Sequence, residues 1–268
     1  MERETFIQKI TERLSNDPGI DTLFLGGSLG SGLADRFSDI DLLALPKGDA
    51  GEFADRWPGI LGEVAEIVMI RRMGTAPRIL FNAVTVDWMR CDLYLTIADD
   101  LSRRPKGGLK PLIDPHDMHA EMPDAAEPRP IAAARLTYMI EEHLRILGLI
   151  PVALGRGELV TAVQGAGFQR DSLVQLMQMA ANVPADGGLL RLSRDLPAAE
   201  MEVLMALPAA QPDPGSLLAT HRAISDAFLP RARKLAEQAG VTWPAAFEDA
   251  TRRHLVSELG VDLLPVMD

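Results

Sequence analysis

The fold is decided by residues 22–45, which read TLFLGGSLGSGLADRFSDIDLLAL. Two apolar runs in this stretch, Leu23–Leu25 and Ile40–Leu45, predict buried β-strands. Between them lies a small-residue segment that opens with Gly26, Gly27 and Ser28. Glycine allows a close approach of the backbone to a ligand, and a tight turn into a short helix presents N–H groups to an anion such as phosphate. The stretch therefore predicts a strand, a phosphate-binding turn and a second strand.

Two carboxylates begin the second of these strands. Asp39 and Asp41 are two residues apart, and alternate residues of a strand share one face of the sheet. Both side chains are therefore expected beside the phosphate-binding turn. Carboxylates next to a bound phosphate are the ligands that Mg²⁺ prefers.

The spacing of these residues resembles a known signature. Gly26-Gly27-Ser28, ten residues and then Asp39-Ile40-Asp41 resemble the pattern of the polymerase-β-like nucleotidyltransferase superfamily, and residues 32–38 resemble its antibiotic-modifying bacterial branch. The resemblance implies that Asp39 and Asp41 hold metal ions, and that Gly26, Gly27 and Ser28 bind the nucleotide. Two further residues are candidates for contact with phosphate: Arg36, which is otherwise a surface arginine, and Ser38, which otherwise only shapes the turn.

A third carboxylate is expected on a later strand. Residues 79–86 and 89–97 predict paired strands, with Asp87 and Trp88 at the turn between them. Residues 86–93, VDWMRCDL, resemble the Asp-x-x-Arg-x-Asp-Leu run of several antibiotic nucleotidyltransferases. The resemblance implies that Asp92 completes the catalytic set, either by sharing the metal ions or by taking the proton of the acceptor. Asp87 is either a turn residue or a group on the acceptor side.

A dehydrogenase is the competing interpretation of the glycine-rich segment. Gly26, Gly30 and Gly32 also form a Gly-x-x-x-Gly-x-Gly pattern, which resembles the dinucleotide-binding turn of short-chain dehydrogenases. That family needs a tyrosine followed four residues later by a lysine. The chain has two tyrosines, Tyr94 and Tyr138, and neither has this lysine. The dehydrogenase interpretation is therefore set aside.

Composition narrows the class of partner. The chain has 268 residues and a formal net charge of −11, and neither half is basic. This balance disfavours a nucleic-acid polymer, which needs lysine and arginine to neutralise its phosphates, and suits a small cationic acceptor or simply a soluble surface. A single cysteine, Cys91, indicates a reducing compartment, and no apolar run is long enough to span a membrane. We therefore predict a cytoplasmic protein without a membrane partner.

The order of the patterns predicts two domains. Alternating strand and helix patterns fill residues 1–101, and a segment rich in Pro, Gly and charge, 102–130, predicts a linker or surface excursion with a short strand at 111–114. From residue 131 to 268 the period becomes helical. The predicted fold is an α/β (α+β) nucleotidyltransferase domain with a mixed β-sheet, followed by an all-α helical bundle.

Together with the net charge, the resemblance implies a transfer of AMP from ATP to a hydroxyl of a small cationic acceptor, above all an aminoglycoside, with two Mg²⁺ ions. Asp92 is the candidate general base. Glu141, Glu142 and Glu158 are candidates for acceptor binding or for the base, although a solvated helix face, with Glu141 pairing to Arg145, is the simpler explanation of them. Two alternatives stay open: the same chemistry on protein or tRNA, and a catalytically silent nucleotide-binding module.

Overall fold

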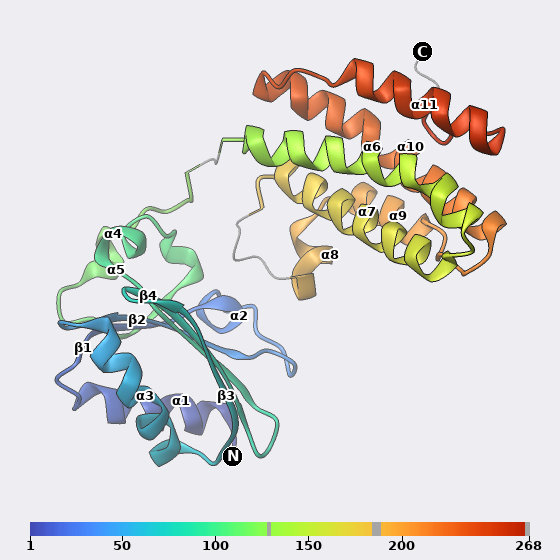
Figure 1. Ribbon diagram of the computed structural model, residues 1–268. Helices are drawn as coiled ribbons and strands as arrows, with labels where there is room; N and C mark the ends of the chain where they lie inside the picture. The colour runs from blue at the N-terminus through green and yellow to red at the C-terminus, as the bar shows by residue number, and fades with distance from the viewer. Residues whose placement is uncertain (128–129, 184–188, 266–268) are drawn as a thin grey trace. The chain divides into compact units, whose positions relative to one another are not determined.

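The computed structural model describes residues 1–127, 130–183 and 189–265. The chain divides into two compact units, residues 1–127 and residues 128–268 (Figure 1). The first unit contains every strand in the described part of the chain, and the second is built from helices. This arrangement agrees with the predicted order of an α/β domain followed by a helical one.

The first unit is built on a six-stranded mixed sheet with the order β3-β4-β5-β2-β1-β6. Strands β2 and β5 run parallel, and the other neighbouring pairs are antiparallel. The parallel pair is possible because α3, β3 and β4 form the crossover between its two strands. The strands are β1 (Ile20–Leu25), β2 (Ile40–Pro46), β3 (Ile67–Thr75), β4 (Arg78–Thr85), β5 (Arg90–Leu95) and β6 (Lys110–Ile113).

Helices α1 (Arg3–Ser15) and α3 (Ala50–Val64) cover one face of the sheet. Phe6, Phe53 and Trp57 from these helices are fully buried against it. Strand residues that point into the same core include Ile40 and Cys91. Because successive strand residues point to opposite faces, the neighbours of these two residues in the chain lie on the other face.

A small second core covers part of the opposite face. It contains Phe24, Leu43, Leu101, Leu109 and Met122, and the last three come from the segment after β5. That segment forms α4 (Ala98–Leu101), the 3₁₀ helix η1 (Lys106–Gly108), β6 and α5 (Met118–Glu121).

The sequence predicts a linker or surface excursion over residues 102–130, and the boundary between the two units lies near the end of this segment. Its residues up to 127 belong to the first unit, because Leu109 and Met122, with Leu101 just before the segment, anchor an otherwise polar stretch. The short strand predicted at 111–114 is present as β6. Residues 128–129, at the end of the predicted linker, lie outside the described residues.

Strand β3 departs from the sequence expectation. Residues 71–78 read as a polar connection, yet β3 continues to Thr75 and α3 extends to Val64. Strand β3 is the outermost strand, and its side chains from Val68 to Thr75 are exposed. An edge strand tolerates arginines that a central strand would not, so polarity alone did not reveal it.

The second unit is a helical bundle around a core that includes Leu136, Leu144, Leu173, Ile224 and Phe228. Gly148 and Pro151 predict that the first helix of this unit ends near them, and this prediction is wrong, because α6 runs through the proline to Gly155. No helix in the described ranges is long and apolar enough to cross a membrane. The helices are α6 (Ala133–Gly155), α7 (Leu159–Ala180), α8 (Leu192–Asp195), α9 (Ala198–Ala206), α10 (Pro214–Ala239) and α11 (Ala245–Leu259), with the 3₁₀ helix η2 (Leu189–Arg191) before α8.

A buried polar network crosses the middle of this bundle. Gln169 on α7 donates from Nε2 to the carbonyl oxygen of His143 (3.1 Å), and its Oε1 lies 2.6 Å from Nδ1 of His221. Nε2 of His143 lies 3.1 Å from the hydroxyl of Ser225, and the imidazole stacks on Phe228 with ring centroids 4.2 Å apart. Burial lowers the pKa of His143 to about 3 and that of His221 to about 4. Both histidines are therefore neutral at pH 7.

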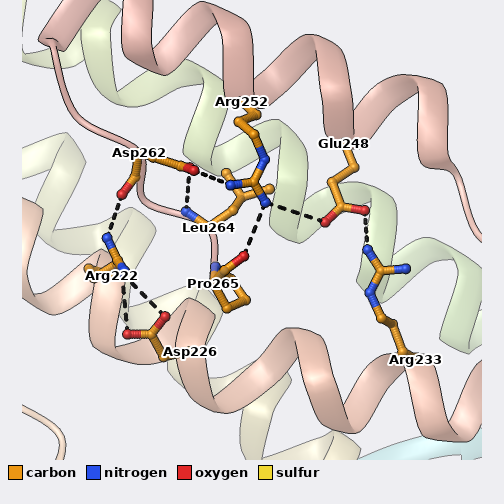
Figure 2. A network of polar contacts seen from close by, with 8 residues as sticks. All are labelled: Arg222, Asp226, Arg233, Glu248, Arg252, Asp262, Leu264 and Pro265. Carbon is orange, nitrogen blue, oxygen red and sulfur yellow. Dashed lines mark hydrogen bonds and ion pairs between the residues drawn. The ribbon is translucent and has the colours of Figure 1, made fainter. Parts of the chain in front are cut away.

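The segment after α11 is fastened to the bundle by arginines (Figure 2). Arg222 donates to the carbonyl oxygen of Asp262 (2.6 Å), and Arg252 pairs with the carboxylate of Asp262 and donates to the carbonyl oxygen of Pro265 (3.1 Å). Leu264, which is fully buried, donates its N–H to the Asp262 carboxylate (2.9 Å).

One buried carboxylate on α11, that of Glu248, completes this network (Figure 2). It pairs with Arg233, accepts a hydrogen bond from Nε1 of Trp243 (2.6 Å), and lies 4.0 Å from Arg252.

Candidate active site

The glycine turn packs directly on one of the predicted metal ligands. Gly26 donates its N–H to the carbonyl oxygen of Asp41 (2.8 Å), and the short helix α2 (Gly27–Gly30) follows. Gly27 has a φ of +58°, and a Cβ atom there would lie 1.8 Å from Oδ2 of Asp41. A residue with a side chain would therefore be strained in its backbone and would collide with the carboxylate.

The turn is held in place from its other side by η1. A Cβ atom on Gly30 would lie 2.3 Å from the carbonyl oxygen of Leu25 and 2.6 Å from that of Gly108. His119 in turn lies within hydrogen-bond distance of the carbonyl oxygens of Lys106 (3.1 Å) and Leu109 (3.0 Å). The segment after β5 thus fixes the position of the predicted phosphate-binding turn.

The three predicted carboxylates lie on the face of the sheet that α1 and α3 leave open. Asp41 on β2 and Asp92 on β5 are direct partners in the parallel ladder, so their Cα atoms are about 5 Å apart. Asp39 precedes Asp41 by two residues and follows the same alternation. All three side chains are half-buried, and none points into the apolar core.

Asp39 also has a cationic neighbour. Its Oδ2 lies 3.4 Å from Nη2 of Arg90, and the same nitrogen donates to the carbonyl oxygen of Phe37 (3.1 Å).

Across residues 1–127, 130–183 and 189–265, no group of three or more His, Cys, Asp or Glu side chains is arranged to hold a metal ion. The three carboxylates therefore share one surface without forming a ready three-ligand site, and their role as metal ligands stays a prediction.

Electrostatic effects distinguish Asp92 from its neighbours. Burial raises the pKa of this carboxyl above its ordinary range. A side-chain hydrogen bond from Asn82 and the charge of Arg90 oppose the rise in pKa, and the negative charge of Asp39 adds to it. A carboxylate with a raised pKa is a better proton acceptor, which suits a general base.

Asn82 is a functional candidate that the sequence analysis did not identify. It is the direct partner of Asp92 across the antiparallel β4–β5 ladder. Residues 79–85 alternate between buried and half-buried positions, with Asn82 on the half-buried side. That alternation was the available signal, but an asparagine in a strand carries no motif of its own.

Behind the carboxylates lies Cys91. Burial, together with the charges of Asp92, Asp41 and Asp39, raises the pKa of this thiol. The thiol is therefore neutral, and its burial is that of a small side chain that fills the core.

The other candidates of the first unit are placed on loops. The guanidinium of Arg36 lies over the ring of Phe37, 4.3 Å from its centroid. The hydroxyl of Ser38 accepts from the N–H of Asp35 (2.9 Å) and donates to its carboxylate (3.1 Å), so Ser38 shapes the loop before Asp39. Asp87 is exposed at the β4–β5 turn, where its carboxylate accepts from the amino group of Met1 (2.8 Å).

The three glutamates proposed for acceptor binding belong to the second unit. Glu142 forms a two-pronged pair with Arg145 (2.7 and 2.6 Å), and this pair lowers the pKa of the Glu142 carboxyl. The pairing expected between Glu141 and Arg145 is thus made by Glu142 instead. Glu141 is exposed on α6, and Glu158 is exposed at the start of α7.

Comparison with known proteins gives similarity to solved structures only. No protein-family model matches the chain, and no curated protein matches it. Among solved structures, the chain is similar to an aminoglycoside 6-adenyltransferase from Bacillus subtilis. The two share 14% sequence identity over 95% of this chain and 98% of that chain, with a TM-score of 0.42.

Proposed function

We propose that this chain is a Mg²⁺-dependent nucleotidyltransferase that transfers AMP from ATP to a hydroxyl of a small acceptor. The observation that carries the proposal is the position of Asp41. This residue is paired in register with Asp92 on one side and touches the glycine turn at Gly27 on the other. A phosphate held at the turn would thus lie beside two carboxylates.

In the reaction, the hydroxyl oxygen of the acceptor attacks the α-phosphorus of ATP. A new O–P bond forms, the bond from the α-phosphorus to the bridging oxygen breaks, and pyrophosphate leaves with the bonding electron pair. Asp92 accepts the proton of the attacking hydroxyl. Its raised pKa, caused mainly by burial, favours this role, which is worth roughly 10²–10⁴-fold in rate.

The chemistry of the carboxylates fits magnesium. Mg²⁺ is commonly bound by one or two carboxylates together with phosphate oxygens of the substrate, so two aligned aspartates are sufficient to begin a site. When bound, the ion would neutralise charge on the phosphate oxygens. Asp41 would hold it, and Asp39 would join once its carboxylate exchanges Arg90 for the ion, which leaves Asp92 to accept the proton. Arg90 would keep its hydrogen bond to Phe37.

The turn would bind the triphosphate through backbone groups of Gly26 and Gly27 and through the hydroxyl of Ser28. Ser28 is half-buried in α2, next to the carboxylates. Arg36 is available for an outer phosphate because it lies on the exposed loop that follows. The intramolecular bonds of the Ser38 hydroxyl support its role in the loop rather than in phosphate binding.

An aminoglycoside is the first acceptor to test, because a chain with a net charge of −11 attracts cations. Of the three candidate glutamates on the second unit, Glu142 already holds Arg145, whereas Glu141 and Glu158 are exposed. The acidic balance disfavours tRNA as an acceptor. The presence of all three carboxylates on one open face disfavours a catalytically silent module.

The test is release of pyrophosphate in the presence of Mg²⁺, with ATP, GTP, CTP and UTP against a panel of aminoglycosides and other hydroxyl-bearing antibiotics. We expect turnover with ATP and its loss in the Asp41→Asn variant. The matched control is Asp55→Asn, on the helix-covered side, where Asp55 pairs with Arg72. Retention of more than roughly a tenth of wild-type turnover by Asp41→Asn would refute the assignment.

A further inference from the structure

The face that carries Asp92 continues across two more strands. Asn82 on β4 is the direct partner of Asp92, and Arg71 on β3 is the direct partner of Asn82. Directly paired residues of a sheet place their side chains on the same face. A polar row therefore runs outward from the carboxylates, with Arg71 about 10 Å from Asp92 at the Cα atoms.

Apolar side chains flank this row. Met69 and Met73 are two residues before and after Arg71 on the same strand, so they share its face, and each remains 38% exposed. Leu80 is the partner of Met73, and Tyr94 is the partner of Leu80, and both are half-buried. The result is an open surface beside the site, with a polar centre and apolar margins.

The opposite face of the same strand is different. Ile70 and Arg72 point toward α3, and Arg72 donates to the carboxylate of Asp55 (2.6 Å). Arg71 has no ion pair within the ranges that the structure describes, although it is exposed. Two adjacent arginines thus differ in their surroundings: one is paired on the helix side, and the other faces the carboxylate side.

We propose that the surface formed by Met69, Arg71, Met73, Asn82 and Tyr94, called here the β3–β5 surface, binds the acceptor. This inference rests on the proposed function, because the acceptor must bring its hydroxyl to Asp92 while ATP lies at the glycine turn on the other side of Asp41. The β3–β5 surface is the continuation of the site on the acceptor side, away from that turn.

The chemistry of this surface specifies the part of the acceptor that it contacts. Methionine side chains adapt to apolar rings of varied shape, and Tyr94, whose ring packs on the small second core with the guanidinium of Arg104 5.8 Å from its centroid, adds aromatic surface at the margin. Arg71 attracts an anionic or strongly hydrogen-bond-accepting group and repels ammonium groups. The part of the acceptor that lies on this surface therefore presents an apolar ring face and an anionic or hydrogen-bond-accepting group about 10 Å from the reacting hydroxyl. Any ammonium group that it carries lies elsewhere.

A binding experiment tests the surface without relying on catalysis. The probe is 8-anilinonaphthalene-1-sulfonate, whose fluorescence rises when its apolar rings are bound and whose sulfonate suits Arg71. We expect Arg71→Glu to weaken binding of the dye at least about tenfold, which is the effect of reversing one close charge. The matched control, Arg72→Glu, should change the affinity for the dye less than about twofold. Equal affinities in the two variants would overturn the proposal.

The apolar margin is tested by a second pair of variants. Met73→Gln should weaken dye binding several-fold, whereas Ile70→Gln, on the helix-covered side, should not. An effect of Ile70→Gln equal to that of Met73→Gln would place the dye elsewhere and overturn the proposal. All four variants lie on an edge strand, so their folding can be confirmed by circular dichroism before the titration.

An activity experiment separates this inference from the proposed function. In pyrophosphate release, Arg71→Glu should raise KM for anionic or neutral acceptors and lower it for polycationic ones, with kcat little changed. The ratio of the two kcat/KM values should shift by at least about tenfold. If wild-type protein releases pyrophosphate and this ratio stays constant, the β3–β5 surface does not select the acceptor. If the protein releases none while the dye still depends on Arg71, the reaction is wrong and the surface stands.

Discussion

The substitution Gly27→Ala examines the contact on which the proposed function depends. Gly27 has a φ of +58°, and its added Cβ would lie 1.8 Å from Oδ2 and 2.8 Å from Cγ of Asp41. An ordinary contact needs about 3.5 Å, so the carboxylate must move by more than roughly 1 Å. A displacement of about 1 Å in a catalytic group can reduce the rate about 10²-fold.

Two costs must be separated in this variant. A residue with a side chain in the left-handed region costs about 1–2 kcal/mol of stability, whatever its surroundings. Gly32 provides the matched control, because its φ is +71° and a Cβ atom there would meet nothing within 4 Å. We therefore expect Gly27→Ala and Gly32→Ala to lose a similar free energy of unfolding through backbone strain, with any additional loss at Gly27 caused by the collision.

The assay combines denaturant unfolding with pyrophosphate release. We expect kcat/KM to fall about 10²-fold in Gly27→Ala, which corresponds to about 2.7 kcal/mol, and to fall less than about threefold in Gly32→Ala. Calorimetric titration with Mg²⁺ and ATP should show the same contrast. If Gly27→Ala keeps more than about a third of wild-type kcat/KM, the carboxylate of Asp41 does not need its observed position, and the reasoning fails.

Three further predictions concern the metal site and the helical unit. Binding of ATP should require Mg²⁺, because the Asp41 and Asp92 carboxylates would otherwise repel the triphosphate; equal affinities with and without the ion in calorimetry would contradict this. Stability should fall as the pH falls below 6.5, because unfolded His143 and His221 take up protons that their folded forms, with pKa values of about 3 and about 4, do not. Between pH 8 and pH 5, each histidine should lower the free energy of unfolding by about 2 kcal/mol. Urea unfolding should therefore show a total loss of about 4 kcal/mol, which is halved in His221→Gln. A free energy of unfolding that does not change over this pH range would contradict the burial of the two histidines. Glu248→Gln should lower the free energy of unfolding by about 1–3 kcal/mol, because Arg233 and Trp243 lose a charged partner. Unfolding followed by fluorescence measures this change. An unchanged free energy of unfolding would show that the contacts of Glu248 in Figure 2 contribute little to stability.

The sequence analysis identified the centre of the first unit because its signals are local. The run from residue 22 to residue 45 contains two apolar strands, a glycine turn and an alternating pair of acids, and each of these depends on near neighbours. The pairing of Asp41 with Asp92 depends on a parallel ladder between residues 51 positions apart, and the sequence indicated only that the two strands would be near each other. The resemblance to a known motif supplied the third carboxylate.

Predictions made from local sequence pattern were wrong where tertiary packing outweighed that pattern. Pro151 suggested a helix end, but α6 continues because Ile146, Leu147 and Ile150 around it are buried in the bundle. Arg71 and Arg72 suggested a loop, but an edge strand places one on each face. Asn82 and Arg90 matter through their partners across the sheet, Asp92 and Asp39, and no single-sequence pattern reveals such partners.

The position of Cys91 offers a way to observe the first unit directly. It is the chain's one sulfhydryl, fully enclosed on the reverse side of the strand that bears Asp92. A thiol-modifying reagent can reach it only when β5 separates from the helices behind it. The speed of modification therefore reports how often this half of the molecule opens. A substrate that binds at Asp92 and stabilises β5 should slow modification of the Cys91 thiol. The rate of modification would then measure how much of the protein has substrate bound, without an activity assay.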